Sequence, residues 1–135
     1  MSESDKRLGR ARVRILIVDD SSLVRLYCRD VLESAGFEVD QAINGIEAIE
    51  KVLAQTFDLV IVDVNMPRMD GFSFLRALRA SAKDAASLPA LVITTEAGKQ
   101  DREDARAAGA SYYLLKPVSE YDLVRHVAVL TGTLP

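Results

Sequence analysis

Five short apolar runs, separated by longer segments with helical spacing, constrain the fold of this chain more than any other feature. The runs cover residues 13–18, 38–42, 59–62, 90–93 and 112–115. Residues 15–18 and 59–62 are apolar throughout, which is typical of central strands covered on both faces, whereas residues 38–40 alternate as in an edge strand. Strict alternation of strands and helices predicts right-handed crossovers and an α/β fold with a doubly wound, five-stranded parallel sheet.

The segments between and after these runs predict five helices. In four of them apolar residues recur at helical spacing. The predicted stripes are Leu23, Val24, Tyr27, Val31 and Leu32; Ile46, Ile49 and Leu53; Phe74, Leu75 and Leu78; and Tyr121, Val124, Val127 and Ala128. In the remaining helix, residues 99–108, the only apolar residues are alanines. Because burying a large aliphatic side chain stabilises by roughly 1.5 to 3 kcal/mol, this helix is expected to be weakly anchored.

Length, charge and cysteine content exclude several classes of protein. The 135 residues, 49% of them hydrophobic, suit one domain, expected over residues 13–131 between tails at 1–12 and 132–135. A net charge of -3 gives no basic footprint for nucleic acid. No apolar run approaches the roughly 18 residues of a membrane span, and residues 1–14 lack an apolar signal core, so we expect a cytoplasmic protein. We also expect it to be a monomer. Cys28 is the only cysteine, which excludes an internal disulfide and a four-cysteine zinc site.

Chemically active side chains follow the predicted strands at the points where they end. Asp19 and Asp20 follow the first strand, Asp63 follows the third, Thr94 the fourth and Lys116 the fifth. Because ligands of open α/β sheets bind outside the carboxyl ends of the strands, we expect these side chains to converge in one crevice. Three carboxylates repel one another unless a cation lies between them, and oxygen ligands suit Mg²⁺. The alternative is that the aspartate pair only caps the next helix and shapes the turn.

Asp63 begins an irregular loop, residues 63–71, in which a proline and a glycine disfavour a helix. The loop can present the Asp63 carboxylate and the Asn65 backbone carbonyl to one ion. Aspartate is an established nucleophile that forms aspartyl phosphates, and a metal ion beside it offsets the charge of an incoming phosphoryl group. Lys116 would add positive charge for the phosphoryl oxygens, and the Thr94 hydroxyl would donate to one of them.

The order of these residues resembles the receiver domain of two-component response regulators. The matching motifs are Asp19-Asp20, Asp63, Asn65-Met66-Pro67, Asp70-Gly71, Thr94 and Lys116-Pro117, and the similarity extends over residues 13–131. It is greatest to single-domain regulators of the chemotaxis type, and it implies a flavodoxin-like sheet with the order 2-1-3-4-5. It also implies that a histidine kinase or a histidine phosphotransfer protein phosphorylates Asp63. The implied ligands of Mg²⁺ are Asp19, Asp20, Asp63 and the backbone carbonyl of Asn65.

By the same resemblance, Thr94 and Tyr113 are expected to convert phosphorylation into a change of protein partner. Tyr113 lies in the fifth predicted strand, where the aromatic residue of the family turns inward on activation. Asn65 and Glu96 follow Asp63 and Thr94 by two positions. We therefore expect these two side chains to flank the path of the water that removes the phosphoryl group.

Three residues depart from the pattern of chemotaxis regulators that bind a flagellar motor. Arg102 and Glu103 replace residues that are usually aliphatic there, and His126 stands where the last helix often carries a lysine. The pathway therefore stays open between chemotaxis-type signalling and a phosphorelay in which the chain passes its phosphoryl group to a histidine phosphotransfer protein.

Two further classes of function fit the pattern less well. A metal-dependent aspartyl phosphatase usually carries Asp-x-Asp at its nucleophile, but here the second position is Asn65, and the missing general acid argues against turnover of external substrates. We therefore expect a phosphoacceptor switch and not an enzyme. A flavin or nucleotide binder needs a Ser-, Thr- or Gly-rich phosphate loop after the first strand, where Asp19 and Asp20 would repel a phosphate.

Overall fold

The structure, a computed structural model, describes residues 12–66 and 68–133. The expected tails at 1–12 and 132–135 therefore lie largely outside the described residues. In chain order the elements are β1 (Arg14–Val18), α2 (Ser22–Ser34), β2 (Glu38–Ala42), α3 (Gly45–Ala54), β3 (Leu59–Val62), α4 (Gly71–Arg79), α5 (Lys83–Ala86), β4 (Ala90–Thr94), α6 (Lys99–Ala108), β5 (Tyr112–Leu115) and α7 (Glu120–Thr131). Among these residues no helix is both long and apolar enough to cross a membrane.

The strands form one parallel sheet in the order β2-β1-β3-β4-β5. In its centre Ile15 is in register with Val39 on one side and with Leu59 on the other. β1, β3 and β4 lie inside the sheet, and their apolar residues are almost all buried, whereas β2 and β5 lie at the edges with a mixed burial pattern. The predicted flavodoxin-like sheet and its order are confirmed.

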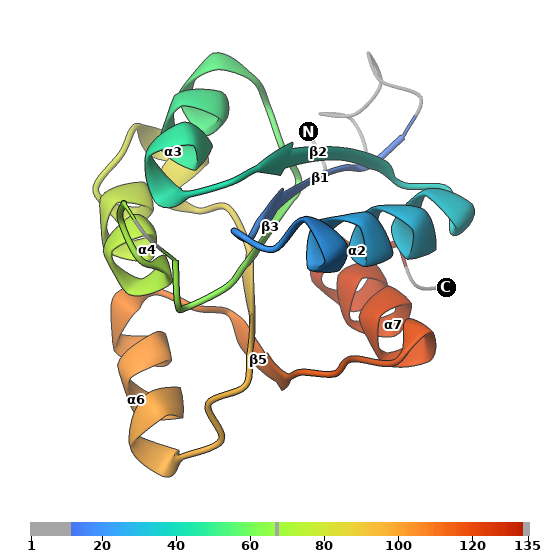
Figure 1. Cartoon of the computed structure of the whole chain (residues 1–135). Coiled ribbons are helices and arrows are strands. Elements are labelled where there is room, and N and C mark those ends of the chain that lie inside the picture. Colours follow the sequence, from blue (N-terminus) through green and yellow to red (C-terminus); the bar gives the residue numbers. More distant parts are fainter. Residues whose placement is uncertain (1–11, 67, 134–135) are drawn as a thin grey trace.

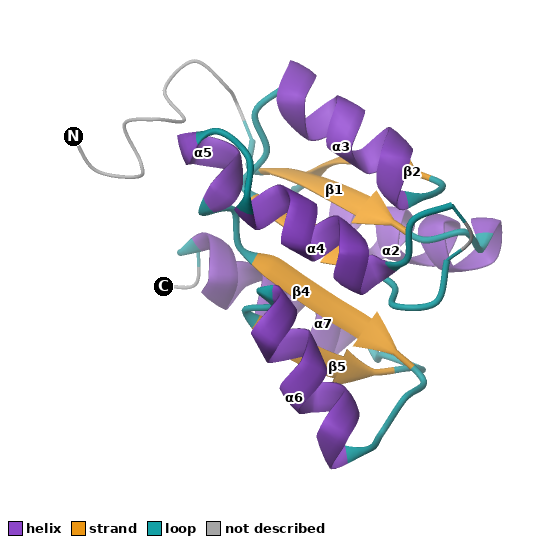
Figure 2. Cartoon of the chain, turned by 90° about the vertical axis from the view of Figure 1, so that its left-hand side faces the viewer, coloured by secondary structure: helices purple, strands orange, loops and turns teal. Residues whose placement is uncertain are grey.

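Helices cover both faces of the sheet (Figures 1 and 2). α2 and α7 lie on one face, and α3, α4 and α6 lie on the other. Alternate residues of each central strand enter opposite cores, because successive strand side chains point to opposite faces. Leu16 and Val62 belong to the core under α3, α4 and α6, while Ile15 and Ile61 belong to the core under α2 and α7.

α3 buries a face offset from the predicted stripe, and α2 and α7 each expose part of theirs. In α3 the buried residues are Gly45, Ala48 and Val52, each one position before a predicted residue, and Leu53 is 63% exposed. A helix turns by about 100° per residue, so a shift of one position changes the buried face, and small residues allow closer packing on the sheet. In the same way Leu23 at the start of α2 and Tyr121 in α7 are exposed. The assignments of Leu53, Leu23 and Tyr121 were therefore wrong. Ile49 packs against the core, Leu32, Val127 and Ala128 are buried, and the residues predicted for α4 are confirmed.

The described residues contain one helix beyond the five predicted. α5 is a single turn of four residues in the connection between α4 and β4. So short a helix has no apolar periodicity of its own, because two turns are needed before a stripe repeats. It does not alter the order of the sheet.

α6 buries only Ala105 and Ala108, as its composition predicted. Its C-terminal end is nevertheless held by polar contacts. The Arg79 guanidinium of α4 donates to the carbonyl oxygen of Gly109, which ends α6 in the left-handed conformation, and also to the Leu88 carbonyl. The C-terminal end of α6 therefore has a charged anchor in place of a large apolar one.

Candidate functional site

Backbone hydrogen bonds fix the two strand ends that carry Asp19 and Asp63. The Asp19 amide donates to the Ala42 carbonyl at 3.1 Å, and the Asp63 amide donates to the Val18 carbonyl at 2.9 Å. The ladders of β1 and β3 therefore continue one residue beyond the strands. Both aspartates are buried, with 3% and 7% of their surface exposed. Rigid backbone thus holds both carboxyl groups at the predicted edge of the sheet.

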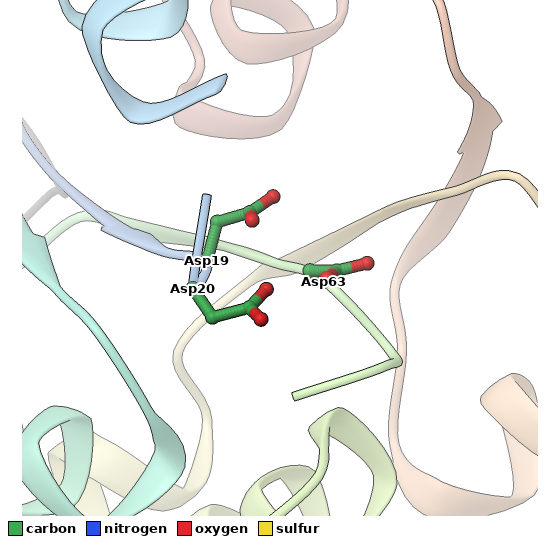
Figure 3. Close-up of side chains that lie close together, drawn as sticks. All are labelled: Asp19, Asp20 and Asp63. Carbon is green, nitrogen blue, oxygen red and sulfur yellow. The ribbon is translucent and has the colours of Figure 1, made fainter. Parts of the chain in front are cut away.

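Asp20 completes an acidic cluster with these two residues. Each aspartate offers one carboxylate oxygen, and the three oxygens lie within 4.8 Å of one another. Figure 3 shows the three side chains extending to the same side of the strand ends. A cluster of oxygen donors with one exposed member suits Mg²⁺, which prefers oxygen ligands and keeps several waters. The residues present therefore fit this metal.

Ser21, rather than either aspartate, caps α2. Its hydroxyl accepts a hydrogen bond from the Val24 amide at 3.3 Å, and the Asp19 carboxylate accepts one from the Ser21 amide at 2.9 Å. The Arg25 guanidinium donates to the Asp19 carbonyl. Sequence reasoning did not anticipate this role of Arg25, because nothing in the pattern of α2 distinguishes it from a solvated arginine. Capping alone therefore does not account for the paired aspartates.

Lys116 joins the two buried aspartates. Its Nζ lies 3.1 Å from Asp19 Oδ2 and 3.4 Å from Asp63 Oδ1. The Lys116 amide donates to the Thr94 carbonyl at 2.8 Å, which fixes the residue beyond β5. Burial disfavours the ammonium, but the hydrogen bond and charge of Asp19, together with those of Asp63, outweigh burial and raise the pKa of Lys116. Lys116 therefore remains a cation in the site.

Asp63 has a raised pKa. The largest cause is burial, followed by the negative charge of Asp19, while Lys116 and the Asn65 amide act in the opposite direction. The three carboxylates of the cluster also face a single lysine, which leaves an excess of negative charge in the site. The site is expected to attract a further cation, consistent with its fit to Mg²⁺.

The loop after Asp63 approaches the start of α4 so closely that only glycine fits there. A Cβ on Gly71 would lie 2.3 Å from the Asp63 carbonyl oxygen and 2.8 Å from Val64 Cα. The Gly71 amide donates to the Val64 carbonyl at 2.9 Å. The start of α4 therefore lies directly against the backbone of Asp63, and the sequence marked Gly71 only as a turn residue.

Other residues of the loop confirm its irregular conformation. Arg68 and Met69 have positive φ values of 53° and 80°. The Asp70 carboxylate accepts a hydrogen bond from the Ser73 amide at 2.8 Å and so caps α4. Pro67, to which the sequence assigned a role in this turn, lies outside the described residues.

Glu96 connects the remaining predicted residues. Its amide donates to the buried Thr94 hydroxyl at 3.2 Å, and its carboxylate accepts from the Asn65 side-chain amide at 3.4 Å. Its carbonyl accepts a hydrogen bond from the Tyr113 hydroxyl. The guanidinium carbon of Arg102 lies 5.5 Å from the centre of the Tyr113 ring. The sequence placed these residues near the site, but the central position of Glu96 and the contact of Arg102 depend on packing between separate elements.

The sequence is similar to known signalling proteins over nearly its whole length. The profile of the response regulator receiver domain matches residues 15–128. The chain is 39% identical over 119 residues to the sensor protein EvgS of Escherichia coli, which covers 88% of this chain and 10% of that protein. It is 38% identical over 105 residues to a gliding motility regulatory protein of Myxococcus xanthus, covering 78% of this chain and 13% of that protein. The chain therefore spans only about a tenth of the length of these relatives.

Solved structures of similar proteins match the fold. The chemotaxis protein CheY4 of Vibrio cholerae is 36% identical with a TM-score of 0.84, and the match covers 89% of this chain and 99% of that chain. The receiver domain of the sensor histidine kinase PA1611 of Pseudomonas aeruginosa is 30% identical with a TM-score of 0.84, covering 90% of this chain and 99% of that chain. The latter structure contains a magnesium ion coordinated in its active site cleft.

Proposed function

The chain belongs to the family of response regulator receiver domains, and from this premise we propose that it is a phosphorylation switch whose phosphoacceptor is Asp63. Receiver domains act in two-component signalling, where their partners are histidine kinases or histidine phosphotransfer proteins. In the proposed step a carboxylate oxygen of Asp63 attacks the phosphorus of a phosphohistidine. The new P–O bond forms as the P–N bond breaks, and the leaving imidazole nitrogen takes up a proton from solvent.

The observation that carries the proposal is that Asp63 is a buried member of the acidic cluster and also contacts Lys116. Asp19 already accepts hydrogen bonds on both oxygens, from the Ser21 amide and from Lys116. Asp63 contacts Lys116 at 3.4 Å and the Asn65 amide, and its carboxylate lies in the same cluster as the exposed Asp20. It is therefore the buried carboxylate best placed to act as a nucleophile.

The same residues divide the remaining roles. Asp19, Asp20, Asp63 and the backbone carbonyl of Asn65 would hold Mg²⁺, which when bound supplies positive charge for the phosphoryl oxygens. Lys116 supplies a second, fixed positive charge, since its ammonium already reaches both buried carboxylates. Because the Lys116 ammonium is already held by both carboxylates, its electrostatic contribution is organised in advance.

Thr94 and Tyr113 would transmit the modification. In the unmodified protein the Thr94 hydroxyl accepts from the Glu96 amide, and Tyr113 is bonded to the same residue. A phosphoryl group on Asp63 offers stronger acceptor oxygens to the Thr94 hydroxyl, and drawing Thr94 toward them would alter the contacts of Glu96 and Tyr113. The output is a change in the surface that a partner protein contacts.

Asn65 and Glu96 would tune the lifetime of the phosphorylated state. Their side chains meet at 3.4 Å across the two loops that border Asp63. Both are exposed, and we expect them to flank the path of water to a phosphoryl group on Asp63. The switch would lose its phosphoryl group by hydrolysis there and would turn over no external substrate, which an assay with p-nitrophenyl phosphate checks.

For the pathway we propose chemotaxis-type signalling, supported by the similarity to CheY4 over almost the whole of both chains. The alternative is a phosphorelay intermediate, and the identity with the sensor protein EvgS favours it. The two differ in a measurable property. A relay intermediate passes its phosphoryl group reversibly to a histidine phosphotransfer protein, whereas a chemotaxis-type switch loses it to water.

Intact mass measurement after treatment with acetyl phosphate and Mg²⁺ tests the proposed function. The wild type is expected to gain one phosphoryl group and Asp63→Asn none. Asp70→Asn is the matched control, because it changes an exposed aspartate of the same loop to a residue that caps a helix equally well. Labelling of Asp63→Asn to the wild-type extent would overturn the proposal.

A further inference from the structure

Arg102 of α6 contacts the aromatic residue that the proposed switch uses. Its guanidinium carbon lies 5.5 Å from the centre of the Tyr113 ring. Arg102 itself is exposed, whereas Tyr113 is half-buried and packs against the core under α3, α4 and α6. A guanidinium at this distance is attracted to the ring face, and at an exposed site the attraction favours the contacting position by a factor of about 2 to 5.

Tyr113 is tied through its hydroxyl to the loop between β4 and α6. The hydroxyl donates to the Glu96 carbonyl. Glu96 in turn contacts Thr94 through its amide and Asn65 through its carboxylate. One residue therefore joins the end of β4, the loop after Asp63 and strand β5. The hydrogen bond of the Tyr113 hydroxyl therefore ties the loop between β4 and α6 to β5.

We infer that Arg102 is a positioning residue of the phosphorylation site: by holding the Tyr113 ring it keeps the Tyr113 hydroxyl on Glu96 and so keeps residues 95–98 closed beside Asp63. With the loop closed, Glu96 stays against Asn65 and limits the access of water to the phosphoryl group. Removal of Arg102 loosens the loop and accelerates hydrolysis. The inference rests on the proposed function, because its functional consequence is the lifetime of a phosphorylated Asp63.

Arg106 provides a matched control. It lies one helical turn after Arg102, carries the same charge and is also exposed. Both arginines line the same groove of about 350 Å³ beside Tyr113. Among the described residues the cation that lies over the Tyr113 ring is Arg102. Removing either arginine would reveal a general effect of positive charge on α6. An effect through the Tyr113 ring would appear only when Arg102 is removed.

Amide hydrogen exchange in the unphosphorylated protein tests the positioning role directly. In Arg102→Ala the amides of residues 95–98 are expected to exchange about two- to fivefold faster than in the wild type, the factor expected from a lost cation–π contact. Arg106→Ala should exchange as the wild type does, and Arg102→Lys, which keeps a cation on a flexible stem, should retain part of the protection. Wild-type exchange in Arg102→Ala, or equal acceleration in Arg106→Ala, would overturn the inference.

A double variant tests whether Arg102 acts through the Tyr113 hydroxyl. Tyr113→Phe keeps the ring but removes the bond to Glu96, so exchange of residues 95–98 should already be faster in this variant. Adding Arg102→Ala to Tyr113→Phe should then change the exchange of this loop no further. A further acceleration in the double variant would show that Arg102 acts by another route, and the inference would be wrong.

The phosphorylated lifetime gives the functional readout. After labelling with acetyl phosphate and removal of the donor, Arg102→Ala should lose its phosphoryl group about two to five times faster than the wild type and Arg106→Ala at the wild-type rate. An unchanged lifetime in Arg102→Ala would contradict the role in hydrolysis. If the wild type accepts no phosphoryl group, the proposed function fails, while the exchange experiments still decide the positioning role.

Discussion

Gly71→Ala tests whether the close approach of α4 to the loop sets the position of Asp63. The added Cβ would lie 2.3 Å from the Asp63 carbonyl oxygen, and contacts below 3.0 Å are essentially never seen, so the two segments must separate by at least about 0.7 Å. The contacting atoms belong to backbone and cannot rotate away. Overpacking of this kind costs about 1 to 3 kcal/mol, and the better helix propensity of alanine offsets less than about 1 kcal/mol of it.

We therefore expect Gly71→Ala to lose about 1 to 2 kcal/mol of stability, which corresponds to a Tm lower by about 3 to 8 °C for a domain of this size. The displacement falls on the residue that carries the nucleophile. Because a misplacement of about 1 Å at a reacting group costs on the order of a hundredfold in rate, labelling by acetyl phosphate should slow by at least about tenfold. Differential scanning calorimetry and intact mass measurements follow the two effects separately.

Gly132→Ala is the control for a loss of stability without displacement of the site. Gly132 ends α7 with a φ of 70°, and a Cβ there would meet nothing within 4 Å. Alanine in this left-handed conformation costs about 1 to 2 kcal/mol, so its Tm should fall by a similar amount while labelling stays at the wild-type rate. The reasoning is refuted if Gly71→Ala accepts a phosphoryl group as fast as Gly132→Ala does.

Three further predictions concern the charges and side chains around the site. Asp20→Asn should weaken Mg²⁺ binding, measured by calorimetric titration, yet raise the Tm in EDTA, because it removes one of three mutually repelling carboxylates; a lower Tm in EDTA would count against the cluster. The pKa of Asp63 is raised by burial and then by Asp19, so its folded pKa exceeds its unfolded one. Its contribution to stability is therefore present below the unfolded pKa and is lost as pH rises through the folded value. As pH rises above the ordinary aspartate pKa of about 4, the metal-free wild type should lose Tm relative to Asp63→Asn, and parallel curves would contradict this. Replacing Asn65 and Glu96 together with methionine should block water and lengthen the phosphorylated lifetime, measured by mass after donor removal, and an unchanged lifetime would place these side chains away from the water path.

The strands and the convergence of the site could be predicted because both depend on local pattern. Residues 59–62 are apolar throughout and lie in the centre of the sheet as β3, and Asp63 follows directly at the predicted edge. The parallel arrangement brings Asp19 and Lys116, 97 positions apart in sequence, to within 3.1 Å. The sheet order itself came from the resemblance to a known family.

The parts that could not be predicted depend on packing between elements. The buried face of α3 follows small residues such as Gly45, which the search for large apolar side chains passes over, so Leu53 was wrongly assigned to the core. The close approach at Gly71 requires the path of the loop, and the Arg102 contact requires the distance between α6 and β5. None of these distances is encoded in the spacing of residues along one element.

The central claim, that Asp63 carries the phosphoryl group, is tested most directly by chemical trapping. Borohydride reduces an aspartyl phosphate to homoserine, so the modified position can be identified by peptide mapping after treatment with acetyl phosphate and Mg²⁺. We predict homoserine at position 63 in the wild type, with Asp19 and Asp20 unchanged, and no homoserine in protein that has not been exposed to the donor. Homoserine at position 19 or 20 with Asp63 unmodified, or none at any position in donor-treated protein, would contradict the account.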